Sequence, residues 1–219
     1  NSILRRSNMN NEYQNLHPAM ATKLSPPARW GYDLLERPHL LEKLLTKQPK
    51  RLILITAAAG YGKSTLMAQG SPVLQQPKQV TAWLTIDEDD NDPVRLFTYL
   101  FLALQSDKSA SLQLPEPTWI TRNHAAKLTS LMTESGAPTI LFIDEFENLI
   151  NPDSQQLINW MWDYLPPGAR RLIASRPRPA WDPSKLAWPV RTHNLRLPTK
   201  DQVCVRGYAA AVQKKPAWT

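Results

Sequence analysis

The sequence of 219 residues has few side chains suited to redox or metal chemistry, with a single cysteine, Cys204, and four histidines. One cysteine excludes an internal disulfide framework and a thiolate metal cluster. The histidines, at positions 17, 39, 124 and 193, lack the spacing of a metal-binding motif. These absences argue against a disulfide-stabilised or zinc-binding module and favour a reducing, cytoplasmic environment.

Long apolar runs are also absent. No stretch approaches the roughly 18 apolar residues of a transmembrane helix, and the N-terminus has no basic and then apolar signal pattern. Glycine is scarce, with seven residues against twenty prolines, which predicts many rigid connections. We therefore expect a protein that does not associate with a membrane.

The charge is positive but dispersed. The formal net charge is +7 and the isoelectric point about 9.6, yet lysine and arginine are scattered rather than gathered in one run. This pattern favours a general solubility charge over a nucleic-acid surface. The hydrophobic content of 42% and the length suit one substantial α/β core with little left for a second.

One segment joins an aliphatic run to a loop of small residues. Residues 52–56 read Leu-Ile-Leu-Ile-Thr, as expected for a strand buried on both faces of a parallel sheet. The loop that follows matches a relaxed Walker A motif, in which an alanine replaces the first glycine. Its predicted nucleotide-binding residues are Ala57, Ala58, Ala59, Gly60, Tyr61, Gly62, Lys63, Ser64 and Thr65.

The chemistry of a phosphate site explains this spacing. Gly60 and Gly62 let the backbone bend, so that successive N–H groups and the start of the next helix point at an anion. Lys63 would reach the β- and γ-phosphates, Ser64 would bind Mg²⁺ and Thr65 could reach an α-phosphate. The alternative is a glycine turn before an ordinary helix, which the preceding strand and following helical pattern disfavour.

A second segment, residues 139–145, carries two adjacent acids at the end of an apolar run. This is the Walker B arrangement, in which Asp144 holds Mg²⁺, generally through water, and Glu145 polarises the attacking water. The alternative is that the acids only cap the next segment. We predict Ser64 and Asp144 as the metal-binding residues.

Arg176 lies just past a fourth predicted strand, residues 171–175, which read Arg-Leu-Ile-Ala-Ser. An arginine at the end of a strand beside a nucleotide site could contact the γ-phosphate through charge-assisted hydrogen bonds. Position alone does not separate this role from that of an ordinary surface arginine. The predicted catalytic residues are Glu145, Asp144 and Arg176.

The remaining pattern completes an α/β fold. We expect residues 22–28 to be extended, and the acidic turn at 87–92 to be a solvated loop in which Asn91 or Asp92 caps the next helix. The predicted fold is a P-loop NTPase three-layer sandwich, with a mostly parallel sheet of about five strands and helices on both faces. Further helices are expected at 39–45, 95–105, 125–133 and 153–165, and further strands at 80–86 and 193–197.

These segments, in this order, resemble the nucleotide-binding domain of the large ATP-dependent LuxR-type transcription regulators, the group that includes the maltose-regulon activator. Those domains belong to the STAND class of signalling ATPases and are NB-ARC/AAA-like. The resemblance spans about residues 22–197. It rests on Thr22-Lys-Leu-Ser-Pro-Pro27, Arg37-Pro-His-Leu-Leu-Glu42, the loop at 57–65, residues 82–93, Phe142-Ile-Asp-Glu145 and Ile173-Ala-Ser-Arg176.

The resemblance implies an ATP/ADP switch with Mg²⁺, in which ATP favours a self-associating form and slow hydrolysis resets it. It also implies that the strand ending at Ser175 separates the other two motif-bearing strands. Lys63 and Ser64 would bind phosphate and Mg²⁺, Asp144 would support the metal, and Arg176 would sense the γ-phosphate. Three residues depart from the family pattern: Glu145 stands where the family often has a second aspartate, Ala58 replaces a proline, and Glu147 falls near a position that is often histidine.

Three segments follow from this comparison. We predict a disordered leader at 1–21, a P-loop ATPase domain at 22–198 and a divergent tail at 199–219. The tail no longer follows the family pattern, which suggests a truncated product or the start of a following helical domain.

Three functions stay open at this point. The chain is an ATP-binding switch domain of a LuxR-type activator that hydrolyses ATP slowly, a stand-alone P-loop ATPase, or a truncated remnant without catalysis. Adenine is expected because of the resemblance and because no guanine-reading Asn/Thr-Lys-x-Asp motif occurs. Full-length relatives bind DNA, but this chain has no helix-turn-helix candidate, so we expect no direct DNA binding.

Overall fold

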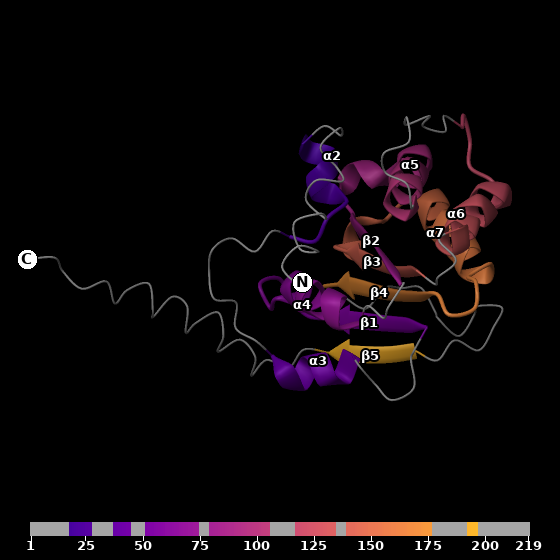
Figure 1. Cartoon of the computed structure of the whole chain (residues 1–219). Coiled ribbons are helices and arrows are strands. Elements are labelled where there is room, and N and C mark those ends of the chain that lie inside the picture. The colour runs from indigo at the N-terminus through magenta and orange to yellow at the C-terminus, as the bar shows by residue number, and fades with distance from the viewer. Residues whose placement is uncertain are drawn as a thin grey trace, which may run out of the picture.

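A parallel sheet organises the chain (Figure 1). The computed structural model describes residues 18–27, 37–44, 51–74, 79–105, 117–134, 139–176 and 192–196. Five strands pair in the order β2-β3-β4-β1-β5, and every neighbouring pair is parallel. The strands are β1 (Leu52–Thr56), β2 (Val80–Thr85), β3 (Thr139–Asp144), β4 (Arg170–Ser175) and β5 (Thr192–Arg196).

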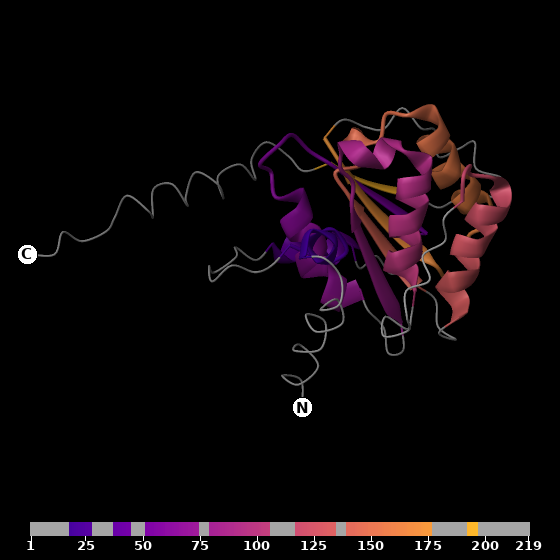
Figure 2. The ribbon, with the colours of Figure 1, turned by 90° about the horizontal axis from the view of Figure 1, so that it is seen from above.

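Helices cover both faces of this sheet, which makes a three-layer sandwich (Figure 2). One face carries α3 (Pro38–Leu44) and α4 (Lys63–Leu74). The other face carries α5 (Pro93–Leu104), α6 (Arg122–Glu134) and α7 (Pro152–Asp163). The predicted fold class is confirmed.

Alternation along the strands divides the core between the two faces. Ile53 and Ile55 of β1 pack with α3 and α4, whereas Leu52 and Leu54 pack with α5, α6 and α7. Successive side chains of a strand point to opposite faces, so a strand covered on both sides must be apolar at every position. This requirement explains why β1 is aliphatic from Leu52 to Ile55 and β3 is apolar from Ile140 to Ile143.

The strand order brings the two motifs to one edge. β4 lies between β1 and β3, with Thr56 paired in register with Ser175 and Ile143 with Ile173. All carboxyl ends therefore lie on the same side, and the loops that follow β1, β3 and β4 are neighbours. The separation of the two motif-bearing strands, which the resemblance implied, is confirmed.

The segment at the start of the described chain differs from the sequence prediction. Residues 22–28 were expected to be extended, but α2 (Pro18–Lys23) is helical, so this prediction is wrong for its first residues. The predicted leader at 1–21 lies mostly outside the described residues, and its last four residues belong to α2. The tail at 199–219 lies outside the described residues altogether.

A buried ion pair explains why α2 is held against the domain. Lys23 Nζ lies 2.6 Å from Asp90 Oδ2 and 2.6 Å from Asp87 Oδ2. Asp90 is completely buried in the 3₁₀ helix η1 (Glu88–Asn91), and burial raises its pKa despite the lysine. Burial also acts to raise the pKa of Asp87, but Lys23 outweighs it and the net shift is downward.

The acidic turn is therefore more than the solvated loop expected from sequence. Asp92 does cap α5, since its Oδ1 accepts a 2.9 Å hydrogen bond from Val94 N. Asn91 has a different role: its Nδ2 donates to Asn148 O at 2.9 Å, and its Oδ1 accepts from Asn151 N at 2.7 Å. This amide ties the loop after β2 to the loop after β3.

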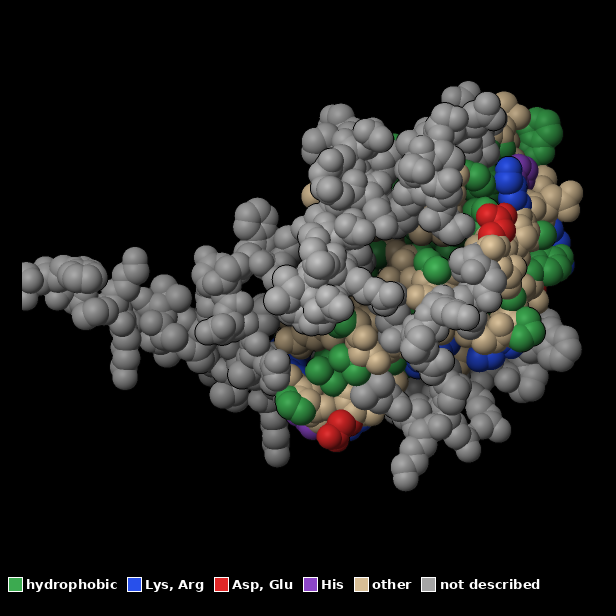
Figure 3. All heavy atoms as spheres, viewed as in Figure 1, with side chains coloured by type: hydrophobic (Ala, Val, Ile, Leu, Met, Phe, Trp, Pro, Cys, Tyr) green, Lys and Arg blue, Asp and Glu red, His purple; other side chains and the backbone are tan. Residues whose placement is uncertain are grey.

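Among the described residues visible in Figure 3, lysine and arginine side chains lie in separate places, one of them beside acidic side chains. Within the ranges described above, no helix combines the length and apolar character needed to cross a bilayer.

Candidate functional site

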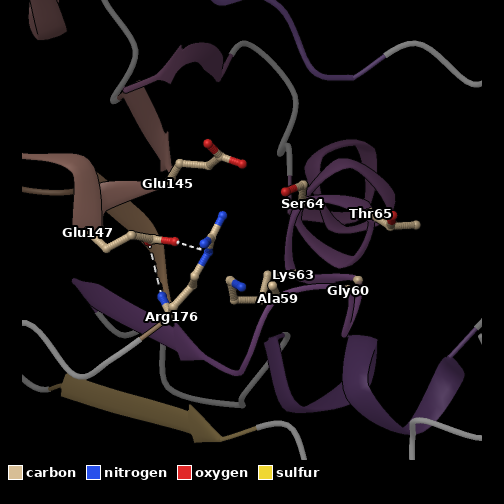
Figure 4. Close-up of a pocket in the computed structure, with 9 residues that line it drawn as sticks. Ala59, Gly60, Lys63, Ser64, Thr65, Glu145, Glu147 and Arg176 are labelled. Carbon is tan, nitrogen blue, oxygen red and sulfur yellow. Dashed lines mark hydrogen bonds and ion pairs between the residues drawn. The ribbon is translucent and has the colours of Figure 1, made fainter. Parts of the chain in front are cut away.

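A pocket of about 300 Å³ opens at the carboxyl edge of the sheet (Figure 4). Its walls come from the loop after β1, the start of α4, and the residues that follow β3 and β4. The volume is at the lower end of the range of about 300–1,000 Å³ seen for small-molecule sites. The lining residues are Ala59, Gly60, Gly62, Lys63, Ser64, Thr65, Glu145, Glu147 and Arg176.

The two glycines of the loop share a backbone conformation but differ in their surroundings. Both have positive φ angles, 79° at Gly60 and 73° at Gly62, a conformation that glycine adopts without the strain of a Cβ. Space around Gly60 is open, whereas a Cβ on Gly62 would lie 2.6 Å from Arg37 Nη2. Arg37 Nη1 donates a 2.9 Å hydrogen bond to Tyr61 O, so this arginine packs directly on the loop.

The Lys63 side chain folds back onto the loop and binds its backbone. Its Nζ donates to Ala57 O at 3.0 Å and to Ala58 O at 3.2 Å, and the side chain is only 8% exposed. Lys63 is also the first residue of α4, so backbone N–H groups at the helix start lie beside its ammonium group. The loop, the ammonium group and the helix N-terminus together form a cationic cradle suited to an anion.

Ser64, which lines the pocket, interacts with Asp144 at the end of β3. The Ser64 hydroxyl hydrogen-bonds the Asp144 carboxylate, and Asp144 Oδ1 accepts a 2.9 Å bond from Glu145 N. Asp144 is 3% exposed, and burial raises its pKa; the charge of Glu145 acts in the same direction, while Ser64 and Lys63 oppose it.

The atoms of Ser64 and Asp144 that could bind a cation are oxygens. One hydroxyl and one carboxylate suit Mg²⁺, which binds few protein oxygens and keeps water or phosphate as its other ligands. Across the described ranges, no group of three or more His, Cys, Asp or Glu side chains is placed to hold a metal.

Glu145 occupies a strained position. Its φ of 52° and ψ of 40° are left-handed, and it is the only non-glycine residue with positive φ among those the structure describes. Such conformations cost about 1–3 kcal/mol and cluster at functional sites. Asn148, at the end of the 3₁₀ helix η2 (Phe146–Asn148), approaches Glu145 Oε2 at 3.4 Å and donates to Ile86 O at 2.9 Å.

Arg176 is held by an acid that sequence reasoning did not assign to the site. Glu147 Oε1 lies 2.9 Å from Arg176 Nε, and Glu147 Oε2 accepts a 3.0 Å bond from Arg176 N. Glu147 is 12% exposed and Arg176 54% exposed. In the sequence, Glu147 stands out only as a departure from the family pattern. Its contact with Arg176 arises because β3 and β4 are neighbouring strands.

The structure brings most of the predicted residues together. Ala59, Gly60, Gly62, Lys63, Ser64, Thr65, Glu145 and Arg176 line one pocket. Asp144 does not line it, but its carboxylate interacts with the Ser64 side chain. The other three predicted loop residues do not line it. Ala57 and Ala58 supply carbonyl groups to Lys63, and Tyr61 supplies one to Arg37.

No protein-family model matches the chain. Among solved structures, the chain is similar to the Orc1 protein of Aeropyrum pernix in complex with DNA, with a TM-score of 0.56 and 14% identity, over 87% of this chain and 53% of that chain. It is also similar to the Walker-type ATPase PABY2304 of Pyrococcus abyssi, with a TM-score of 0.50 and 18% identity, over 88% of this chain and 63% of that chain.

The chain thus spans 53% and 63% of the length of these two structures. Identities this low establish the fold alone. The domain has the α/β fold of P-loop ATPases, and its pocket lies at the carboxyl edge of the sheet, where open α/β sheets bind ligands.

Proposed function

We propose that this chain is an ATP-binding switch domain of the kind found in LuxR-type transcription activators, and that it binds ATP with Mg²⁺ and hydrolyses it slowly. The supporting observation is that three segments distant in sequence meet at one pocket. The loop at 57–65, the acids at 144–145 and Arg176 follow three adjacent strands.

In this proposal the loop binds the phosphate groups. Positive φ angles at Gly60 and Gly62 allow successive backbone N–H groups to face an anion, and the start of α4 adds its own N–H groups. The Lys63 ammonium group would move from the carbonyl oxygens of Ala57 and Ala58 toward the β- and γ-phosphates.

Ser64 and Asp144 would hold Mg²⁺ together with the phosphates. Their hydroxyl and carboxylate oxygens are the donor types that this cation prefers, and the two side chains are already in contact. Bound Mg²⁺ would neutralise charge on the phosphate oxygens. Burial raises the pKa of Asp144, because it disfavours the charged form of the carboxyl group, and a nearby cation would favour that form.

Hydrolysis would use Glu145 as the base. Its carboxylate would accept a proton from a water molecule while the water oxygen bonds to the γ-phosphorus and the bond to the β,γ-bridging oxygen breaks, which releases ADP and phosphate. Asn148 lies near enough to Glu145 Oε2 to orient this carboxylate. Arg176 would bind the γ-phosphate and so distinguish ATP from ADP.

The regulator context rests on the sequence resemblance over residues 22–197. In that context ATP would favour self-association, and hydrolysis would return the domain to a resting form. DNA binding would belong to other segments of a full-length regulator.

Two paired measurements test this proposal. We expect the wild-type protein to elute at a larger size in ATP than in ADP during size-exclusion chromatography, and to hydrolyse ATP slowly. Glu145→Gln should keep the ATP-dependent size change but lose hydrolysis. Glu134→Gln, which alters an exposed carboxylate at the end of α6, serves as the matched control.

The alternatives predict other results. Rapid turnover without a change in size would favour a stand-alone ATPase. A folded wild-type protein that binds neither nucleotide would favour a remnant without catalysis.

A further inference from the structure

Glu147 contacts Arg176 at Nε and at the backbone N, and not at the two terminal nitrogens of the guanidinium group. The carboxylate binds Nε at 2.9 Å through one oxygen and the backbone N at 3.0 Å through the other. Neither contact uses the terminal nitrogens Nη1 and Nη2. In Figure 4 the terminal part of the Arg176 side chain extends past Glu147 into the space between Glu145 and Ser64.

This arrangement fixes a flexible side chain at its backbone N and at Nε. A half-exposed arginine loses up to about 2 kcal/mol of rotamer entropy when it is immobilised. The two hydrogen bonds that Arg176 donates to Glu147 impose that order before any ligand arrives, and Glu147 is itself largely buried at 12% exposure. An anion between Ser64 and Glu145 would then meet an arginine already aimed at it.

We propose that Glu147 is a positioning residue that aims Arg176 at the terminal phosphate of ATP and thereby sets the preference of this site for ATP over ADP. This inference rests on the proposed function, because it assigns a role within the same pocket.

A competing effect has the opposite sign. Glu147 is negatively charged and lines the pocket, so its charge repels a γ-phosphate. If repulsion dominates, Glu147 weakens ATP binding, and its removal strengthens it. If positioning dominates, its removal weakens ATP binding while ADP binding stays the same. The sign of the change therefore separates the two effects.

The test measures Kd for ATP and for ADP, both with Mg²⁺, in four forms of the full chain. These are the wild type, Glu147→Ala, Arg176→Ala and the double variant. We expect Arg176→Ala to lower the ATP preference about tenfold and Glu147→Ala to lower it about fivefold, with ADP affinity unchanged. The double variant should match Arg176→Ala alone, because Glu147 acts only through the arginine.

Several results would overturn the proposal: a higher ATP preference in Glu147→Ala, an unchanged preference, or effects that add in the double variant. Glu134→Ala is the control for loss of an exposed carboxylate and should leave both affinities unchanged. Glu147→Gln keeps one hydrogen-bond acceptor and should fall between the wild type and Glu147→Ala.

A second readout needs no nucleotide. The Nε–H proton of Arg176 should exchange slowly with water in NMR spectra of the free wild-type protein and rapidly in Glu147→Ala. Equal exchange in the two forms would refute the positioning contact. Failure of the wild type to bind either nucleotide would instead refute the proposed function, and the exchange measurement would still report on the contact.

Discussion

The Ser64 hydroxyl, in the first turn of α4, hydrogen-bonds the carboxylate of Asp144 at the end of β3. This contact joins the two chemically distinctive segments of the sequence. It exists because β4 separates β1 from β3 by one strand and all three end at the same edge. The proposed metal site thus depends on strand order as well as on the two residues.

The first prediction concerns the cost of the buried Asp144 carboxylate. Burial raises its pKa in the folded protein above the ordinary value of 3.8, so at neutral pH its charge destabilises the fold. Asp144→Asn removes that charge and keeps groups able to pair with Ser64 and Glu145 N. We expect a higher thermal midpoint for the free variant at pH 7.5, together with loss of Mg²⁺-dependent nucleotide binding.

The stability difference between wild type and Asp144→Asn should depend on pH, because the pKa of Asp144 is raised in the folded protein. A carboxyl group with a raised folded pKa contributes less stability as pH rises from its unfolded value through its folded value. The difference between wild type and Asp144→Asn should therefore shrink as pH falls toward 4. A constant difference from pH 7.5 to pH 4, measured by thermal unfolding, would contradict the assignment.

The second prediction separates the two loop glycines. Gly60→Ala should cost about 1 kcal/mol of stability, because only left-handed strain opposes it in open space. Gly62→Ala should cost about 1 kcal/mol more, because its Cβ displaces Arg37 and breaks the bond to Tyr61 O.

Urea unfolding of these variants provides the measurement. In an Arg37→Ala background, the added cost of Gly62→Ala should fall to that of Gly60→Ala. If the cost is the same with and without Arg37, the arginine does not restrict the loop.

The third prediction concerns the ion pair that holds α2. Lys23→Met leaves Asp90 fully buried without its counter-charge and should cost about 3–5 kcal/mol. Arg95→Met breaks a 3.0 Å contact with Asp89 between exposed side chains and should cost less than about 1 kcal/mol. Chemical denaturation compares the two directly.

Asp90→Asn added to Lys23→Met should recover part of the loss, since it removes the unpaired charge. Similar costs for Lys23→Met and Arg95→Met would mean that burial does not distinguish the two ion pairs.

Much of the fold could be predicted because its signals are local. The strand at 52–56 is aliphatic at nearly every position since both of its faces are covered, and the loop at 57–65 carries its glycines where the backbone has positive φ. The acids at 144–145 likewise mark the end of a buried strand, since Asp144 is the last residue of β3. Each signal lies within a few residues of the feature that it predicts.

Contacts between distant segments could not be predicted in this way. Nothing in the sequence near Lys23 indicates that it will be buried against Asp90, or that the helix α2 will extend to this residue. Arg37 begins one of the segments that resemble the LuxR-type regulators, residues 37–42. Its contact with Tyr61, however, depends on how α3 packs beside α4. Glu147 meets Arg176 only because β3 and β4 are adjacent.

The most direct test of the account is the binding of ATP with Mg²⁺ by isothermal titration calorimetry, in wild type and Lys63→Ala. Lys43→Ala, which removes an exposed lysine from α3, is the matched control. We predict that the wild type and Lys43→Ala bind alike and that folded Lys63→Ala binds at least about a hundredfold more weakly. Equal binding by the wild type and Lys63→Ala, or no binding by a folded wild type, would contradict the account.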